Sequence, residues 1–167
     1  KKQGKWRVVE MATYIGSDQS RFAVLMDLFL NGDNRTSQNA SWVISHVFDS
    51  FPHLLIPYYD ELIDMLQRPV HNAVKRNITR ILGSQEIPNE HLGILADLCF
   101  NFVNDTKEAI AVRVFSLSVL YQICLKEPEL ASELKMTIEI FMPQGSPGFK
   151  SRGKKILNAL NENFNLH

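Results

Sequence analysis

The sequence predicts an all-α fold: about four helical pairs behind an N-terminal capping helix, in a single domain over residues 1–167. Apolar residues recur at the three- and four-residue spacing of amphipathic helices rather than in strand-like alternation. Two short sequence markers also repeat at one common period. The composition, 45% hydrophobic and 22% charged over 167 residues, is that of an ordinary globular chain with a sizeable core.

The N-terminal part of the sequence is expected to hold the capping helix and the least regular pair. Residues 4–15 form the cap, because their apolar side chains share one helical face and a Gly-Ser-Asp turn follows. The first pair is expected at residues 21–31 and 35–51, with an Asn-Gly-Asp turn between them. Its apolar face comprises Phe22, Leu25, Phe29, Trp42, Val43 and Val47.

Two markers define the remaining three pairs. A proline precedes each apolar run at Pro52, Pro88 and Pro128, which are 36 and 40 residues apart. An arginine follows at Arg76, Arg113 and Arg152, which are 37 and 39 residues apart. Because both markers share one period, each interval is expected to be one structural repeat.

Each repeat is expected to contain two helices. First helices are predicted at residues 54–67, 89–103 and 128–142, and second helices at 69–83, 106–126 and 147–163. Within 106–126, the stretch from Ile110 to Cys124 is apolar around most of its circumference. We therefore expect other helices to flank it on both sides.

The run from Leu54-Leu55-Ile56-Pro57-Tyr58 to Leu66, followed by Ala73-Val74-Lys75-Arg76 to Leu82, resembles the HEAT repeat. The likeness covers roughly residues 21–164, and the chain also resembles a small bacterial family of HEAT-like (armadillo/HEAT-type) proteins of unknown function. A HEAT resemblance implies a right-handed α-solenoid whose second helices line a concave surface. It indicates the fold and says little about function.

Two groups of residues that suggest chemistry favour a structural interpretation. Residues 148–155 have the glycine and lysine spacing of a phosphate-binding loop, but Lys155 replaces the Ser or Thr that would hold Mg²⁺ and no strand precedes the segment. We therefore expect Ser146 to cap, and Pro147 to begin, the last helix. Four of the five histidines form no metal-ligand or nucleophile–base pattern; they are His46, His53, His71 and His91.

No catalytic residue, metal site or cofactor is predicted from the sequence. Some members of the small family carry an adenylosuccinate lyase name, but the signature loop of such lyases has no counterpart here beyond Met142-Pro143. Trp42 shares an apolar stripe with Val43 and Val47, which favours packing in the core. The alternative follows HEAT-like DNA glycosylases, which hold a damaged base with aromatic and acidic side chains in a concave cleft.

Charge is divided between the two helix types. The second helices, including residues 35–51, carry eleven Lys and Arg against three acids, whereas the first helices carry two against nine. This pattern predicts a basic concave face that binds an anionic partner. The expected binding residues are Lys75, Arg76, Arg80, Arg113, Arg152 and Lys155. An alternative is that the arginines at the repeat period pair inside the stack.

The predicted function is therefore a non-catalytic scaffold that binds a protein or acidic peptide. The alternative function is a HEAT-like DNA-binding or alkylpurine glycosylase-like repair protein, with nucleic acid as its partner. No secretory signal or membrane-length apolar run occurs in the sequence, so the cytoplasm is the expected compartment. Cys99 and Cys124 lie in apolar helical patterns and are expected to be buried free thiols.

Overall fold

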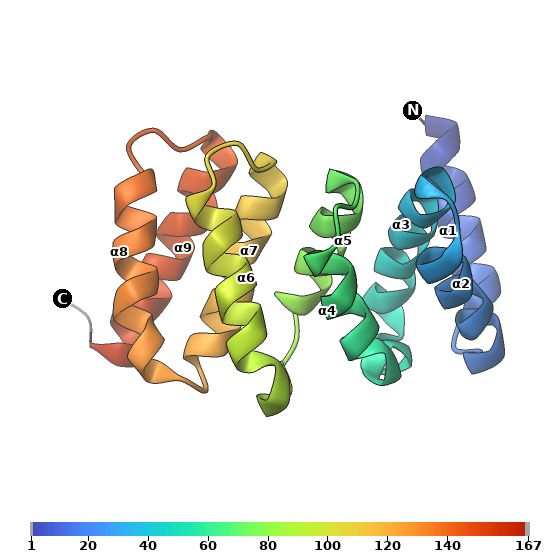
Figure 1. Cartoon of the computed structure of the whole chain (residues 1–167), viewed down its shortest axis with the longest axis horizontal. Helices are drawn as coiled ribbons and strands as arrows, with labels where there is room; N and C mark the ends of the chain where they lie inside the picture. The colour runs from blue at the N-terminus through green and yellow to red at the C-terminus, as the bar shows by residue number, and fades with distance from the viewer. Residues whose placement is uncertain (1, 166–167) are drawn as a thin grey trace. The chain divides into compact units, whose positions relative to one another are not determined.

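The computed structural model describes residues 2–165 and confirms the all-α prediction. Nine α-helices, three short 3-10 helices and no strand are found in this part of the chain (Figure 1). The chain divides into two compact units, the first ending at Ile78 and the second beginning at Thr79. The division falls inside one helix, α5 (Asn72–Leu82), and each unit is described by itself.

The first unit contains the predicted cap and the first pair. The cap is α1 (Lys2–Ile15), and the pair is α2 (Gln19–Asn31) with α3 (Asn34–Ser50). Helix α3 packs against both α1 and α2. The 3-10 helix η1 (Pro52–Tyr58), α4 (Tyr59–Gln67) and the start of α5 follow. The side chains buried in the core include Phe22, Met26, Phe29, Ile44, Leu54, Leu62 and Val74.

Aspartates fix where α2 and α3 begin. The Asp18 carboxylate accepts hydrogen bonds from the backbone N–H groups of Ser20 and Arg21, at 2.9 and 3.0 Å. The Asp33 carboxylate accepts one from the N–H of Thr36 at 2.7 Å. These bonds satisfy donors that have no partner inside the first turn of a helix. Mainly because of them, the pKa of each carboxyl group lies below its usual value.

The second unit contains the other two repeats. Their elements are η2 (Asn89–His91), α6 (Leu92–Asn104), α7 (Ile110–Cys124), η3 (Pro128–Leu130), α8 (Ala131–Phe141) and α9 (Pro147–Phe164). Helix α7 packs against α6, α8 and α9. The prediction that this helix is flanked on both sides is therefore confirmed. Its buried residues include Val112, Leu117, Val119, Leu120 and Ile123.

Each predicted first helix that follows a marker proline begins with a 3-10 turn. The α-helical part of the first of them starts at Tyr59 instead of residue 54. Pro57 explains this shift, because it has no N–H to donate to the carbonyl four residues earlier. The predicted start at residue 106 is also wrong, since α7 begins at Ile110. Here the Asp105 carboxylate accepts a hydrogen bond from the Lys107 N–H at 2.8 Å and holds a turn.

The two cysteines confirm their predicted state. Cys99 of α6 and Cys124 of α7 are free and buried. Burial, which disfavours the thiolate, raises the pKa of each thiol to about 12. Both side chains therefore act as small apolar groups in the core of the second unit.

Candidate functional site

The six predicted binding residues lie on three second helices and belong to two units. Lys75 and Arg76 are on α5 in the first unit. Arg80 is near the end of α5, after the division. Arg113 is on α7, and Arg152 and Lys155 are on α9, all in the second unit. The six residues thus lie on second helices, while one shared strip on a concave face stays a prediction.

Arg76 is tied to the interior of the first unit. Its Nε and Nη2 donate hydrogen bonds to Oδ1 of Asn77 at 3.3 and 3.2 Å. Asn77 is buried and donates from Nδ2 to the Ser41 hydroxyl of α3 at 2.9 Å. The Ser41 hydroxyl donates in turn to the Gln38 carbonyl at 2.8 Å. This chain of bonds joins α5 to α3 and gives Arg76 a structural role.

Arg113 is tied to the interior of the second unit. Its Nε donates a hydrogen bond to the backbone carbonyl of Val103 in α6 at 3.0 Å. Its guanidinium carbon lies 4.8 Å from the ring centroid of Phe141 and 5.3 Å from that of Phe149. These distances are in the range of cation–π attraction. Arg113 therefore links α7 to three neighbouring helices.

Arg152 and Lys155 have a different environment. Arg152 is half-buried, and its guanidinium carbon lies 6.0 Å from the ring centroid of Phe115 on α7. Lys155 is exposed one turn later on α9. Neither side chain forms a hydrogen bond or ion pair within the described residues 2–165. By contrast, Lys75 and Arg80 each take part in a polar, ring or electrostatic interaction. Arg152 and Lys155 are thus the cations of the predicted set that are most available to a partner.

One basic residue has a structural role that the sequence did not reveal. Lys126, just after α7, forms a 2.8 Å ion pair with Glu86. Its ammonium also donates to the Ile87 carbonyl at 2.8 Å and to Oδ1 of Asn89 at 3.0 Å. The ammonium of Lys126 holds the pKa of Glu86 below its usual value. This contact ties the end of one repeat to its own start, and no short sequence motif marks it.

The structural interpretation of the phosphate-loop-like segment is confirmed. The Ser146 hydroxyl accepts a hydrogen bond from the Phe149 N–H at 3.2 Å, and Pro147 is the first residue of α9. Gly153 is buried in α9 against α8. The segment is therefore a capped helix start.

Two of the histidines also have structural contacts. His71 accepts a hydrogen bond from the Ala73 N–H at 3.1 Å before α5, and Nδ1 of His46 lies 3.0 Å from the Trp42 carbonyl. No group of three or more His, Cys, Asp or Glu that could hold a metal ion occurs among residues 2–165.

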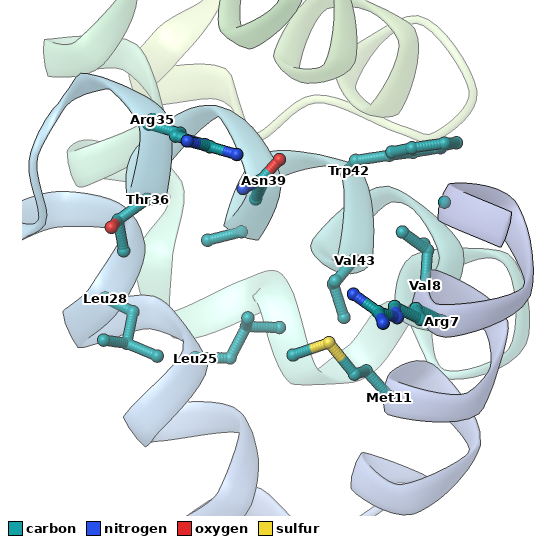
Figure 2. Close-up of a pocket in the computed structure, with 12 residues that line it drawn as sticks. Arg7, Val8, Met11, Leu25, Leu28, Arg35, Thr36, Asn39, Trp42 and Val43 are labelled. Carbon is teal, nitrogen blue, oxygen red and sulfur yellow. The ribbon is translucent and has the colours of Figure 1, made fainter. Parts of the chain in front are cut away.

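Trp42 does not lie in the core, contrary to the interpretation from its apolar stripe. The side chain is half-buried and borders a cavity of about 480 Å³ between α1, α2 and α3 (Figure 2). Its ring lies beside Gly4 of α1, which has no side chain to cover it. Arg7 and Arg35 also line this cavity, and none of the described residues that line it is an Asp or Glu. The aromatic side chain is therefore accompanied by cations instead of the acid that a glycosylase-like site needs.

A comparison with protein families decides the identity of the fold. The model of the HEAT repeat domain matches residues 1–160, which is nearly the whole chain. The chain is a HEAT-repeat protein. No curated protein and no solved structure matches it.

Membership of the HEAT family explains why helical pairs recur at a period of about 36 to 40 residues. HEAT repeats commonly mediate protein interactions. No helix of this HEAT-repeat protein, within residues 2–165, is long and apolar enough to cross a membrane.

Proposed function

We propose that this HEAT-repeat protein acts as one scaffold domain that captures an acidic protein or peptide through the basic residues of its second helices. The observation that carries the proposal is that the charges of Arg152 and Lys155, both on α9, lack hydrogen-bonded or ion-paired partners inside the described chain. An unpaired cation on a surface attracts a carboxylate without first losing an internal contact.

The arrangement around Arg152 favours recognition of carboxylates. The Phe115 ring restrains the guanidinium, whose planar fork can bind a carboxylate with two parallel hydrogen bonds. Lys155 adds a second positive charge three residues further along the same helix. A restrained cation loses less conformational entropy on binding than a freely moving one. Arg152 is therefore the expected anchor, and Lys155 adds long-range attraction.

The six sequence-predicted residues have three roles in this proposal. Arg76 and Arg113 hold neighbouring helices together, since both donate hydrogen bonds inside their own unit. Arg152 and Lys155 contact the partner directly. Lys75 and Arg80 contribute positive charge while keeping their contacts within the chain. The excess of Lys and Arg on second helices then steers an acidic partner to this side of each repeat.

The proposal is tested with the double reversal Arg152→Glu and Lys155→Glu. The probe is a fluorescein-labelled Glu-rich peptide, and fluorescence anisotropy is recorded at about 50 mM salt, where charge attraction is strong. We expect the double variant to bind at least about tenfold more weakly with an unchanged melting temperature. Lys107→Glu, an exposed reversal outside the helices, is the matched control and should retain most of the affinity.

A duplex DNA probe separates the proposal from the nucleic-acid alternative. DNA binding driven by phosphate contacts weakens steeply as salt increases. Tight DNA binding with no peptide binding would replace the proposed partner by nucleic acid. Equal peptide affinities for the double variant and the unmodified protein would contradict the role of α9.

A further inference from the structure

The cavity bordered by Trp42 has the composition of a small-molecule site. It lies wholly within the first unit, between α1 on one side and α2 and α3 on the other (Figure 2). Its volume of about 480 Å³ falls in the range of pockets that bind small organic ligands. Its apolar wall is formed by Val8, Met11, Leu25, Leu28, Ala40 and Val43.

Two arginine side chains border this apolar wall. Figure 2 shows Arg35 and Asn39 of α3 along one edge of the cavity, with Trp42 beside them, and Arg7 of α1 next to Met11 and Val43. Arg7 and Arg35 are exposed, and neither forms a hydrogen bond or ion pair in the described part of the chain. Asp33, whose charge acts weakly on Arg35, is engaged as the N-cap of α3. The described lining residues therefore offer two guanidinium groups and no acid to neutralise them.

We infer that this cavity binds a small organic anion with a flat apolar body, such as an aromatic carboxylate. The apolar wall accepts the body, and the half-buried Trp42 ring provides a stacking surface. Arg7 and Arg35 attract the anionic group from the α1 and α3 sides of the cavity, and a guanidinium can donate charge-assisted hydrogen bonds to carboxylate oxygens. The Asn39 amide adds one neutral hydrogen-bonding group on the side of Arg35. This site is separate from the proposed partner contact on α9.

Two probes of similar shape and different charge test the inference. Isothermal titration calorimetry on the full chain compares 2-naphthoate with its neutral amide, 2-naphthamide. We expect 2-naphthoate to bind at least about tenfold more tightly, since only the carboxylate pairs with the arginines. Arg7→Gln and Arg35→Gln should each weaken 2-naphthoate about fivefold to tenfold and leave 2-naphthamide unchanged.

Two controls locate the binding. Arg68→Gln removes an exposed arginine of the same unit that does not line the cavity, and it should change neither affinity. In nuclear magnetic resonance spectra, 2-naphthoate should shift the indole N–H signal of Trp42 more than that of Trp6, which is outside the cavity. No binding of 2-naphthoate, equal binding of the amide, or an unmoved Trp42 signal would overturn the inference. Reversal of Arg152 and Lys155 should leave 2-naphthoate binding intact, which separates this test from that of the proposed function.

Discussion

Arg113 of α7 donates a hydrogen bond from Nε to the Val103 carbonyl, 3.0 Å away in the last turn of α6. A carbonyl in the last turn of a helix has no partner within that helix, so this bond satisfies an otherwise unpaired acceptor. The same guanidinium lies over the rings of Phe141 and Phe149, which α8 and α9 supply. One side chain at the repeat period therefore stabilises contacts among four helices.

Replacement of Arg113 with Ala is expected to lower the melting temperature. The Val103 carbonyl would lose its partner, and the two rings would lose the guanidinium packed on them. We expect a loss of about 1–3 kcal/mol in the free energy of unfolding. Thermal melts followed by circular dichroism measure it. Lys154→Ala, an exposed change on α9, is the control and should stay within about 0.5 kcal/mol. A melting temperature for Arg113→Ala equal to that of the control would refute the structural role.

Gly153→Ala and Gly93→Ala are expected to have opposite effects on stability. A Cβ at Gly153 would lie 2.9 Å from both Ile138 Cγ2 and Met142 Cε, and Ile138 is fully buried. Overpacking of this kind should destabilise the protein by about 1–3 kcal/mol. A Cβ at Gly93 would meet nothing within 4 Å, so Ala should stabilise α6 by about 0.5 kcal/mol. Urea unfolding of the two variants gives the sign of each change in the free energy of unfolding. Stabilisation by Gly153→Ala would show that α8 and α9 separate easily.

Much of the fold could be predicted because periodic apolar residues have one dominant cause, the burial of a helix face. Leu117 and Phe22 are both fully buried, as their spacing predicts. Helix starts were less predictable because they depend on single groups. Pro57 removes one backbone donor, and the Asp105 carboxylate stabilises a turn, so two helices begin several residues later than predicted.

The candidate sites were predictable only in part, because a side chain's role depends on groups distant in sequence. Arg76, Arg113 and Arg152 share one repeat position, but a buried Asn77 is the acceptor for the first and the Val103 carbonyl for the second. The cavity beside Trp42 forms where α1 meets α3, and its lining combines residues from three helices. No short stretch of the sequence therefore predicts this cavity.

Leu117→Asp is expected to abolish cooperative folding of the second unit. Leu117 has 0% of its surface exposed at the centre of α7, so the carboxylate would be buried without a partner. Ile110→Asp places the same charge on the same helix where 58% of the side chain surface is exposed, and it should fold normally. Circular dichroism melts distinguish the two variants. A cooperative transition near that of the unmodified protein for Leu117→Asp would show that α7 is not central to the fold.

Alkaline pH is expected to destabilise the protein through Cys99. Burial raises the pKa of this thiol from 9.0 to about 12, so above pH 9 the unfolded chain loses a proton that the folded chain keeps. Because the unfolded state then binds fewer protons, stability falls as pH rises between these two values, by about 1.4 kcal/mol per pH unit for one such group. The stability is fully retained below pH 9. Urea unfolding at pH 8 and pH 10.5 measures this effect. Between these pH values the free energy of unfolding should fall less for Cys99→Ala than for the unmodified protein. The variant starts from a lower stability at pH 8, because the substitution creates a cavity. Equal losses for the two proteins would mean that the Cys99 thiolate gains access to water without unfolding.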